Sequence, residues 1–397
     1  MTETALPQLP FPRQDILDVP PLFQALREST PITRVRTPVG DVAWLVTGYS
    51  EAKALFADTR LGRAHPDPER AARVSGAAIL GGPMGDFDTE AEDHALMRKL
   101  LAPAFSARRI RTLQGHIKGL VDGLLDRLAE QERPVDLHEA LSFPLPVLVI
   151  CEVLGVPYAD RDRFRRLSEQ VAMLHDREAA KTGMKGLGAY MVELIAEKRR
   201  EPSEDVISDL LAAQEEWGFG DDYIAGIGAI LLFGGHETTV AQIDYGTLLL
   251  LANPGQFAAL RADPSLAGKA VEEILRVATP GGSGAVLRYA GADIDIAGGY
   301  IRRGDAVLLA FPAANRDPDV FPEPDAFDIS RSANAHLTFG HGARYCIGAG
   351  LARVELQAVF GALPRRFPTL KLAVPMDEVQ WRSDMVTGGL AALPVSW

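Results

Sequence analysis

Residues 339–348 read FGHGARYCIG and place Cys346 among glycines, directly before a helix that we expect to begin near Gly348. Backbone N–H groups and the positive end of a helix lower the pKa of a nearby cysteine, and glycines let the backbone approach a flat ligand closely. The only other cysteine, Cys151, lies in an apolar run that is typical of a buried free thiol. This segment, called the cysteine loop below, therefore predicts a thiolate with a chemical role at Cys346.

The cysteine loop fits the pattern FxxGxRxCxG without a gap, and in this it resembles the haem-binding loop of the cytochrome P450 family. The resemblance implies haem b as cofactor, with Cys346 as its axial thiolate and the iron ligand. It also implies that Phe339, Gly340 and Gly348 shape the haem cradle while Arg344 reaches a haem propionate. A thiolate ligand donates electron density to iron and favours cleavage of the O–O bond over simple carriage of O2.

The apolar pattern predicts a mostly α protein. From about residue 90 to residue 275 apolar residues recur at spacings of three and four, which is typical of helices. After Pro280 the chain changes to Gly-rich turns and short strand-like pieces at 293–296 and 307–309, before a final helix. No linker-like tract divides the chain. We expect the α+β class, with one large domain over residues 1–397 that has a helical core and small peripheral β-sheets of the cytochrome P450 type.

A second motif, ExxR, occurs at Glu273 and Arg276, which lie three residues apart on one helix face. An isolated ExxR is more often a surface ion pair. Arg331 is the second arginine that the resemblance places beside this pair. The resemblance thus implies a structural triad of Glu273, Arg276 and Arg331.

A third motif, GGHETT at residues 234–239, interrupts an apolar helix and resembles the family's oxygen-activation segment. A threonine within a helix can bond back to the carbonyl four residues earlier, here that of Gly234. The resemblance implies that Thr238 and Glu237 are catalytic and deliver protons during oxygen activation. A satisfied helix kink is the structural alternative. A zinc protease is excluded, because Val240 stands where an HExxH motif needs its second histidine.

Further cations match the family's propionate contacts. His94 and Arg98 lie four residues apart in EDHALMRKLL, on one helix face, and cations suit carboxylates. Arg288 in VLRYA and His336 in AHLTFG match two more of these contacts. Either residue alone would more often be an ordinary surface or capping side chain.

Charge restricts the partners. The chain has 397 residues and a net charge of −12, which disfavours a wide nucleic-acid-binding face. The stretch from Arg98 to Lys118 is nevertheless basic and has no acidic residue. The resemblance implies electrons from a ferredoxin and its NAD(P)H reductase, and this stretch is the predicted docking site, although a solvated helix face explains it equally well. The N-terminus shows neither a signal peptide nor a membrane anchor, so we expect a cytoplasmic protein without a membrane partner.

Substrate contacts are expected between the motifs, where loops carry specificity on a fixed scaffold. The candidate segments are residues 77–87 and 171–175. By family position the candidate residues are Ile230, Phe233, Gly234, Val286, Met385 and Val386. Residues 280–284 carry little bulk, which leaves room for a large natural product.

The combined motifs predict a haem-thiolate monooxygenase that uses O2 and two electrons to oxidise a small organic molecule in secondary metabolism. The same haem chemistry could end in oxidative coupling, ring formation or desaturation, because substrate placement decides the outcome. A haem-thiolate sensor without turnover would not need the acid and alcohol at Glu237 and Thr238. A hydrolase with Cys346 as nucleophile and His341 as base lacks the strand-turn-helix pattern that supports such a triad.

Overall fold

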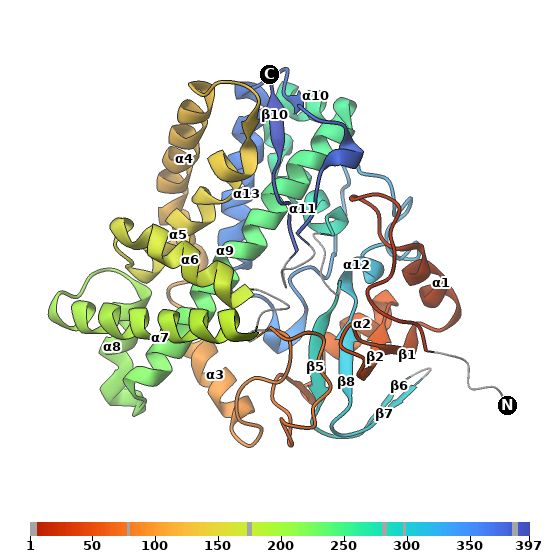
Figure 1. Ribbon diagram of the computed structural model, residues 1–397, viewed down its shortest axis with the longest axis vertical. Coiled ribbons are helices and arrows are strands. Elements are labelled where there is room, and N and C mark those ends of the chain that lie inside the picture. The colour runs from red at the N-terminus through yellow and green to blue at the C-terminus, as the bar shows by residue number, and fades with distance from the viewer. Residues whose placement is uncertain (1–5, 78–79, 173–176, 280–283, 297–298, 383–387) are drawn as a thin grey trace.

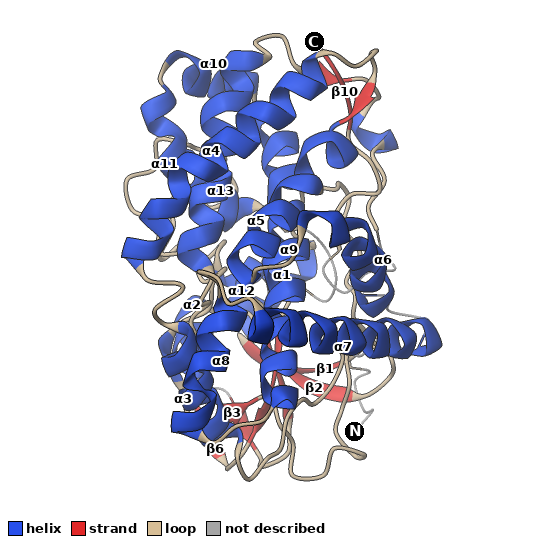
Figure 2. Ribbon diagram, turned by 90° about the vertical axis from the view of Figure 1, so that its left-hand side faces the viewer, coloured by secondary structure: helices blue, strands red, loops and turns tan. Residues whose placement is uncertain are grey.

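Helices form most of the molecule, and the strands gather mainly on one side of it (Figures 1 and 2). The computed structural model describes residues 6–77, 80–172, 177–279, 284–296, 299–382 and 388–397. The helices are α1 (Pro21–Ser29), α2 (Tyr49–Ala57), α3 (Glu90–Leu101), α4 (Ala107–Ala129), α5 (Pro144–Leu154), α6 (Arg161–Ala172), α7 (Arg177–Arg200), α8 (Val206–Trp217), α9 (Asp221–Ala252), α10 (Pro254–Ala262), α11 (Ala267–Val277), α12 (Phe311–Ala314) and α13 (Ala349–Arg366). The strands are β1 (Ile32–Arg36), β2 (Val42–Val46), β3 (Leu61–Gly62), β4 (Val135–Asp136), β5 (Val286–Ala290), β6 (Ile294–Ile296), β7 (Gly299–Ile301), β8 (Ala306–Leu309), β9 (Lys371–Leu372) and β10 (Pro394–Ser396).

The predicted fold class is confirmed: the molecule is mostly α with small sheets. The two strand-like pieces expected after Pro280 are β6 and β8. The final helix α13 begins at Ala349, with Gly348 as its N-cap residue. The expectation that residues 1–397 form one domain stays a prediction.

Helix α9 runs through the middle of the helical part and is its longest element, with 32 residues (Figure 1). It packs against α5, α7, α11 and α13. Its composition is apolar on nearly all sides, which is typical of a helix enclosed by others. By length and hydropathy α9 is the one described helix that could cross a membrane, but 67% of its apolar window is buried inside the protein. The helix therefore fits the core role that its sequence predicts.

Two apolar clusters meet along α9. One joins α9 to α4, α11 and α13, and the other joins it to α5, α7 and α8. The apolar face expected on the last helix belongs to the first cluster, where Leu351 is buried and Val354, Ala358 and Ala362 pack against it. Burial of these side chains is the main stabilising contribution to the helical part.

The largest sheet has five strands in the order β1-β2-β8-β5-β3. Only β2 and β8 pair in parallel, and the other neighbours are antiparallel. In the β5–β8 register Val286 lies opposite Leu309 and Arg288 lies opposite Val307. Because side chains alternate between the two faces of a strand, Val286 and Arg288 share one face of β5. This register directs an apolar and a cationic side chain to the same side of the sheet.

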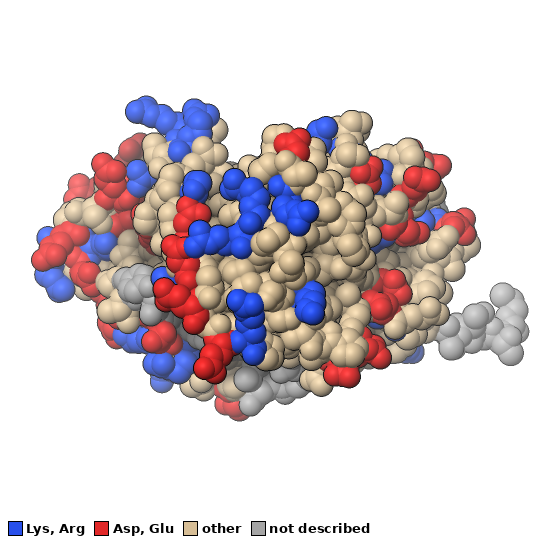
Figure 3. All heavy atoms as spheres, turned by 90° about the horizontal axis from the view of Figure 1, so that it is seen from above, with Lys and Arg blue, Asp and Glu red and all other residues tan. Residues whose placement is uncertain are grey.

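Charged side chains of both signs are spread over the face shown in Figure 3. Several lysine and arginine groups lie over the middle of this face, and aspartates and glutamates lie mainly toward its left and right sides.

A buried carboxylate on α11 gathers several chain segments. Glu273 and Arg276 are both fully buried, and Arg276 donates to the two carboxylate oxygens over 2.8 and 2.7 Å. Arg331 Nε lies 3.2 Å from the same carboxylate. The Asn334 side-chain amide and the Asp328 backbone amide donate to it as well, over 2.9 and 3.0 Å. Each charge therefore has partners, as a buried ion pair requires.

The same cluster extends to the cysteine loop. Arg276 Nη1 donates to the Asn315 carbonyl over 3.1 Å, and the Asn315 side-chain oxygen accepts from the Leu337 amide over 2.7 Å. Thr338 Oγ1 donates to the Leu275 carbonyl over 2.6 Å. Leu337 and Thr338 directly precede the cysteine loop, so the buried ion cluster fixes where that loop starts.

We predict that Glu273→Ala destabilises the protein severely, because it leaves two arginines without their carboxylate. Breaking a buried pair costs roughly 3–5 kcal/mol. Chemical denaturation of the purified variant measures this loss. Glu193→Ala is the matched control, since it removes a carboxylate from an exposed pair with Arg163 and should leave the unfolding midpoint nearly unchanged. Equal midpoints for the two variants would contradict the structural role of Glu273.

Candidate active site

The cysteine loop is held in a turned conformation against α2. Gly340 and Gly342 have φ values of +73° and +72°, which side-chain-bearing residues rarely adopt. A Cβ on Gly342 would lie 2.8 Å from the Ala57 Cα, so only glycine permits this approach. The Cys346 amide donates to the Phe339 carbonyl over 2.9 Å and closes the loop. These contacts fix the position of the Cys346 side chain.

The Cys346 side chain is surrounded by protein atoms but is exposed to the cavity that it lines. Burial raises its pKa, while the backbone amides of Gly348 and Ala349 and the charges of Arg98 and Arg353 act in the opposite direction. The sequence predicted the contribution of the amides but not the larger effect of burial. A positively charged metal ion bound to the sulfur would stabilise the thiolate further.

Two adjoining cavities meet at Thr238. The cavity beside the cysteine loop has a volume of about 720 Å³ and is lined by Cys346, Phe339 and Gly340 on one side and by Thr238 on the other. The second cavity has a volume of about 1110 Å³ and extends from Thr238 toward the protein surface. We call them the inner and the outer cavity. Gly234, Thr238 and Val286 line both.

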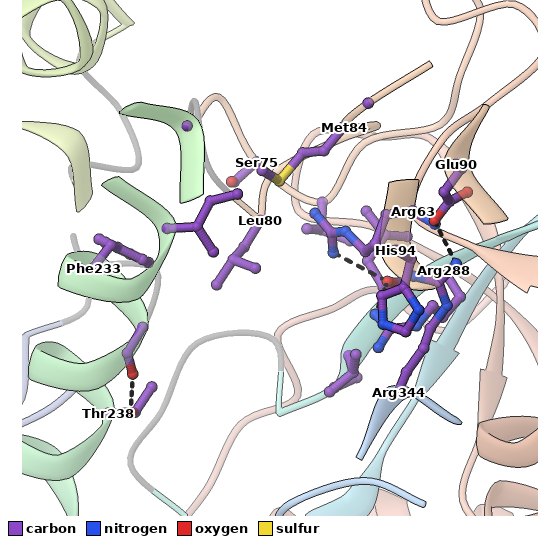
Figure 4. A pocket seen from close by; sticks show the side chains of 18 of the residues that line it. Arg63, Ser75, Leu80, Met84, Glu90, His94, Phe233, Thr238, Arg288 and Arg344 are labelled. Carbon is purple, nitrogen blue, oxygen red and sulfur yellow. Dashed lines mark hydrogen bonds and ion pairs between the residues drawn. The ribbon is translucent and has the colours of Figure 1, made fainter. Parts of the chain in front are cut away.

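Cationic side chains converge on one side of the outer cavity (Figure 4). Arg63, Arg288, Arg344 and His94 come from four separate segments, and Arg288 and Arg344 line the inner cavity too. Glu90 is the single carboxylate drawn among them, 2.7 Å from Arg344. Thr238 and Phe233 lie on α9, across the cavity from this cluster (Figure 4).

This cluster lacks enough negative charge. Burial, followed by the nearby charges of Arg63 and Arg344, lowers the pKa of Arg288 to about 9. Burial and the charges of Arg344 and Arg98 lower the pKa of His94, which favours its neutral form. The guanidinium groups of Arg63, Arg288 and Arg344 surround only one carboxylate, that of Glu90. Two positive charges are therefore uncompensated and would be balanced by two further carboxylates. A flat group that bears two carboxylates and takes one thiolate ligand therefore fits the inner cavity.

The other two cations that the family resemblance predicts as propionate contacts, Arg98 and His336, do not line either described cavity. Arg98 Nη1 donates to the Tyr345 carbonyl over 2.7 Å and so braces the cysteine loop from α3. His336 lies 3.2 Å from Glu272 and does not line either described cavity. The structure thus brings His94, Arg288 and Arg344 together at the cavities but not His336.

Thr238 faces both cavities from the middle of α9. Its hydroxyl donates to the Gly234 carbonyl over 2.8 Å, as the sequence predicts, and a Cβ on Gly234 would meet no atom within 4 Å. Open space therefore lies beside this turn of α9. Glu237 is 5% exposed, does not line either described cavity, and has a carboxylate oxygen 3.6 Å from His236 Nδ1. It lies next to the cavity wall, one residue behind Thr238.

Apolar side chains line most of the rest of the outer cavity, and Asp86, Asp93 and Asp222 also line it. The predicted residues Ile230, Phe233, Gly234 and Val286 all line it, whereas Met385 and Val386 lie outside the described residues. Val74, Ser75, Leu80, Met84, Met97 and Tyr223 also line it. Leu80 and Met84 belong to the segment 77–87 that the sequence singles out. No motif marks Arg63 or Tyr223, because only the tertiary fold brings them to the cavity.

Comparison with known proteins decides the family. The family model described as cytochrome P450 matches residues 85–387. The chain belongs to the cytochrome P450 family. Pentalenolactone synthase from Streptomyces exfoliatus is 48% identical over 99% of both chains. Nocardicin C N-oxygenase from Nocardia uniformis subsp. tsuyamanensis is 41% identical over the full length of both.

Solved structures agree with this membership. The cytochrome P450 PimD, a polyene macrolide antibiotic pimaricin epoxidase, superposes with a TM-score of 0.88 at 40% identity and 99% coverage of each chain. The LnmA cytochrome P450 hydroxylase of the leinamycin pathway from Streptomyces atroolivaceus S-140 gives 0.89 at 38% identity, with 99% and 100% coverage.

Family membership defines the general activity. The protein is a haem-thiolate monooxygenase that binds haem b through a cysteine thiolate, which is Cys346. It acts on a small organic molecule, uses O2 and receives electrons from a redox partner. Haem supplies the inner cavity with a flat group, two carboxylates and the iron that Cys346 ligates.

We predict that Arg288→Gln weakens haem retention by roughly tenfold to a hundredfold, because it removes a charge-assisted hydrogen bond to a propionate. The haem-free variant should unfold at no lower denaturant concentration than the haem-free wild type, because burial disfavours the charge at Arg288 when no propionate is bound. Transfer of haem to apomyoglobin measures the first effect, and chemical denaturation measures the second.

Arg60→Gln is the control, because Arg60 pairs with Asp58 at the surface. Haem loss at the wild-type rate from Arg288→Gln would show that this arginine does not hold a propionate.

Proposed function

We propose that the protein hydroxylates a C–H bond of a large, apolar natural product. The observation that carries this proposal is the outer cavity, whose apolar walls reach Thr238 and so lead to the inner cavity. The outer cavity, at about 1110 Å³, is large beside the usual small-molecule sites of roughly 300–1,000 Å³, and the haem carboxylates would take up part of it on the cationic side. The names of the relatives support a role in the synthesis of such compounds, since they refer to pentalenolactone, nocardicin C and pimaricin.

The Thr238 hydroxyl oxygen can accept a hydrogen bond from a proton-donating group, such as water, at the wall between the two cavities. Its own hydroxyl proton is directed to the Gly234 carbonyl, so its oxygen lone pairs are free to accept a hydrogen bond from the cavity side. A water molecule or an oxygen-bearing group there would be fixed by this bond. Haem, when bound, activates O2 for the oxidation, and the protons that this chemistry consumes must pass this point of α9.

Glu237 is the proposed source of these protons. It is a buried carboxyl group next to His236 and adjacent in sequence to Thr238. A carboxyl group that turns between a solvated and a buried position can carry a proton inward. Arg288, Arg344 and His94 would hold the haem carboxylates, while Thr238 lines the cavity across from them and Glu237 lies next to that wall.

A different outcome of the same chemistry is the second candidate function. The relatives' names include a synthase, an N-oxygenase and an epoxidase, so this scaffold supports several oxidations. After hydrogen abstraction, substrate placement decides between hydroxylation, coupling, ring formation and desaturation. Incorporation of ¹⁸O from labelled O2 into the product would identify hydroxylation. An unlabelled product would identify coupling, ring formation or desaturation.

We predict that Thr238→Ala uncouples the enzyme: reductant is consumed, hydrogen peroxide is released, and product formation falls by roughly tenfold to a hundredfold because the proton donor is no longer positioned. Thr247→Ala is the matched control. Thr247 lies on the same helix and makes the same bond to the carbonyl four residues earlier, also over 2.8 Å, but lines neither described cavity. Equal coupling in Thr238→Ala and wild type would contradict the role of Thr238.

We further propose that a ferredoxin docks beside the cysteine loop, in the cytoplasm. Most cations of the stretch from Arg98 to Lys118 have local partners. Arg98 braces the loop, Lys99 lies over the Trp217 ring, Arg109 pairs with Glu204 and Lys118 pairs with Asp122. Arg108 and Arg111 are exposed and have no ionic partner among the described residues. These two arginines are therefore the available positive charges for an acidic partner.

We predict that the double variant Arg108→Glu, Arg111→Glu slows reduction by a [2Fe–2S] ferredoxin by about tenfold at low ionic strength, and that salt diminishes the difference. Stopped-flow absorbance under CO follows this reduction. Lys371→Glu is the control, because Lys371 is an exposed cation on β9. Unchanged reduction of the double variant would place the docking site elsewhere.

A further inference from the structure

One end of the inner cavity contains an arginine that the haem chemistry does not use. Arg13 lies in the segment before α1 and lines this cavity. Its guanidinium group stacks on Trp381, with 4.1 Å between the guanidinium carbon and the ring centroid. Nη1 donates to the carbonyls of Ile16 and Thr279, both over 3.3 Å. These contacts fix the plane of the guanidinium group.

Unpartnered polar atoms surround this group. Arg13 Nη2, Gln242 Oε1 and Thr279 Oγ1 are buried and have no hydrogen-bond partner among the described residues. Gln242 and Thr279 line the inner cavity together with Arg13. The Tyr245 hydroxyl is buried beside Arg13, whose charge and hydrogen-bonding group oppose the rise of the tyrosine pKa that burial causes; this neutral hydroxyl gives Arg13 a polar neighbour but no counterion. Buried polar groups without partners are costly, so a polar ligand is expected here.

The charge of the inner cavity indicates the type of ligand. Of its described lining residues, Arg13, Arg288 and Arg344 are cationic and none is acidic. Arg288 and Arg344 belong to the cluster that suits the two haem carboxylates. Arg13 lies apart from that cluster, between Trp381 and Thr279. Water would satisfy its hydrogen bond but would leave its charge without a counterion, whereas a carboxylate provides both.

We propose that Arg13, with Gln242 and Thr279, binds a carboxylate group of the substrate. This inference rests on the proposed function, because it assumes that the substrate enters the joined cavities. Arg13 would pair with the carboxylate, and the Thr279 hydroxyl would donate to it; Gln242 would donate through Nε2 once its amide is turned so that Nε2 replaces Oε1 at this position. The substrate class is therefore a largely apolar carboxylic acid.

The helix also sets the distance between the carboxylate and the oxidised carbon. Thr238, Gln242 and Tyr245 follow one another at spacings of four and three, so they share one face of α9. A rise of about 1.5 Å per residue places the carboxylate roughly 6–10 Å along the helix from Thr238. Oxidation is therefore expected several bonds away from the carboxylate rather than next to it.

The test compares an acid with its ester on the haem-loaded protein. Decanoic acid and methyl decanoate share one flexible chain, and only the acid carries a charge. Titration of each into wild type, Arg13→Gln and Arg13→Lys, followed by the spin-state shift of the haem absorbance, gives the dissociation constants. We expect the wild type to bind the acid roughly tenfold to a hundredfold more tightly than the ester. Arg13→Gln should lose this preference, and Arg13→Lys should keep part of it.

Arg27→Gln is the matched control. Arg27 also donates to a backbone carbonyl, that of Ala313, but lines neither described cavity. It should keep the wild-type preference for the acid. Equal binding of acid and ester by the wild type, or an undiminished preference in Arg13→Gln, would overturn the proposal. Binding of methyl decanoate separates this failure from a failure of the proposed function: an ester that shifts the spin state shows that the joined cavities admit an apolar chain, independently of Arg13.

Discussion

The buried carboxylate of Glu273 is the interaction on which the rest of the site depends. It neutralises Arg276 and Arg331 in the protein interior, and Arg276 in turn binds the Asn315 carbonyl. Asn315 holds the Leu337 amide, directly before the cysteine loop. This chain of hydrogen bonds therefore connects α11 to the start of the cysteine loop that carries Cys346.

The active site combines two kinds of structure with different physical roles. The helical core around α9 is apolar and presents Thr238 at a point where Gly234 leaves open space. The sheet side contributes cations, because the β5 register turns Arg288 to the same side as Val286. One part suits an apolar substrate and the other suits the carboxylates of haem. Haem would lie between these two parts, and its two carboxylates would balance the positive charge that the single glutamate of the cationic cluster leaves uncompensated.

The sequence predicts the motifs well because each depends on local spacing. The cysteine loop, the ExxR pair and the Thr238 back-bond to Gly234 all require residues within a few positions of one another. Arg63 and Arg13 could not be predicted, because they come from loops without a motif and reach the cavities only through long-range packing. A motif can also match without its side chain lining a cavity. His336 occupies the expected motif position, but its ring lies 3.2 Å from Glu272 and lines neither described cavity.

The absorbance spectrum of the reduced protein with CO tests the central claim most directly, in wild type and in Cys346→Ala. A thiolate ligand pushes electron density onto the iron and shifts the Soret band far to the red of that of histidine-ligated haem proteins. The account predicts this red-shifted band in wild type and its loss in Cys346→Ala. A wild-type band at the position of histidine-ligated haem, or a red-shifted band that persists in Cys346→Ala, would contradict it.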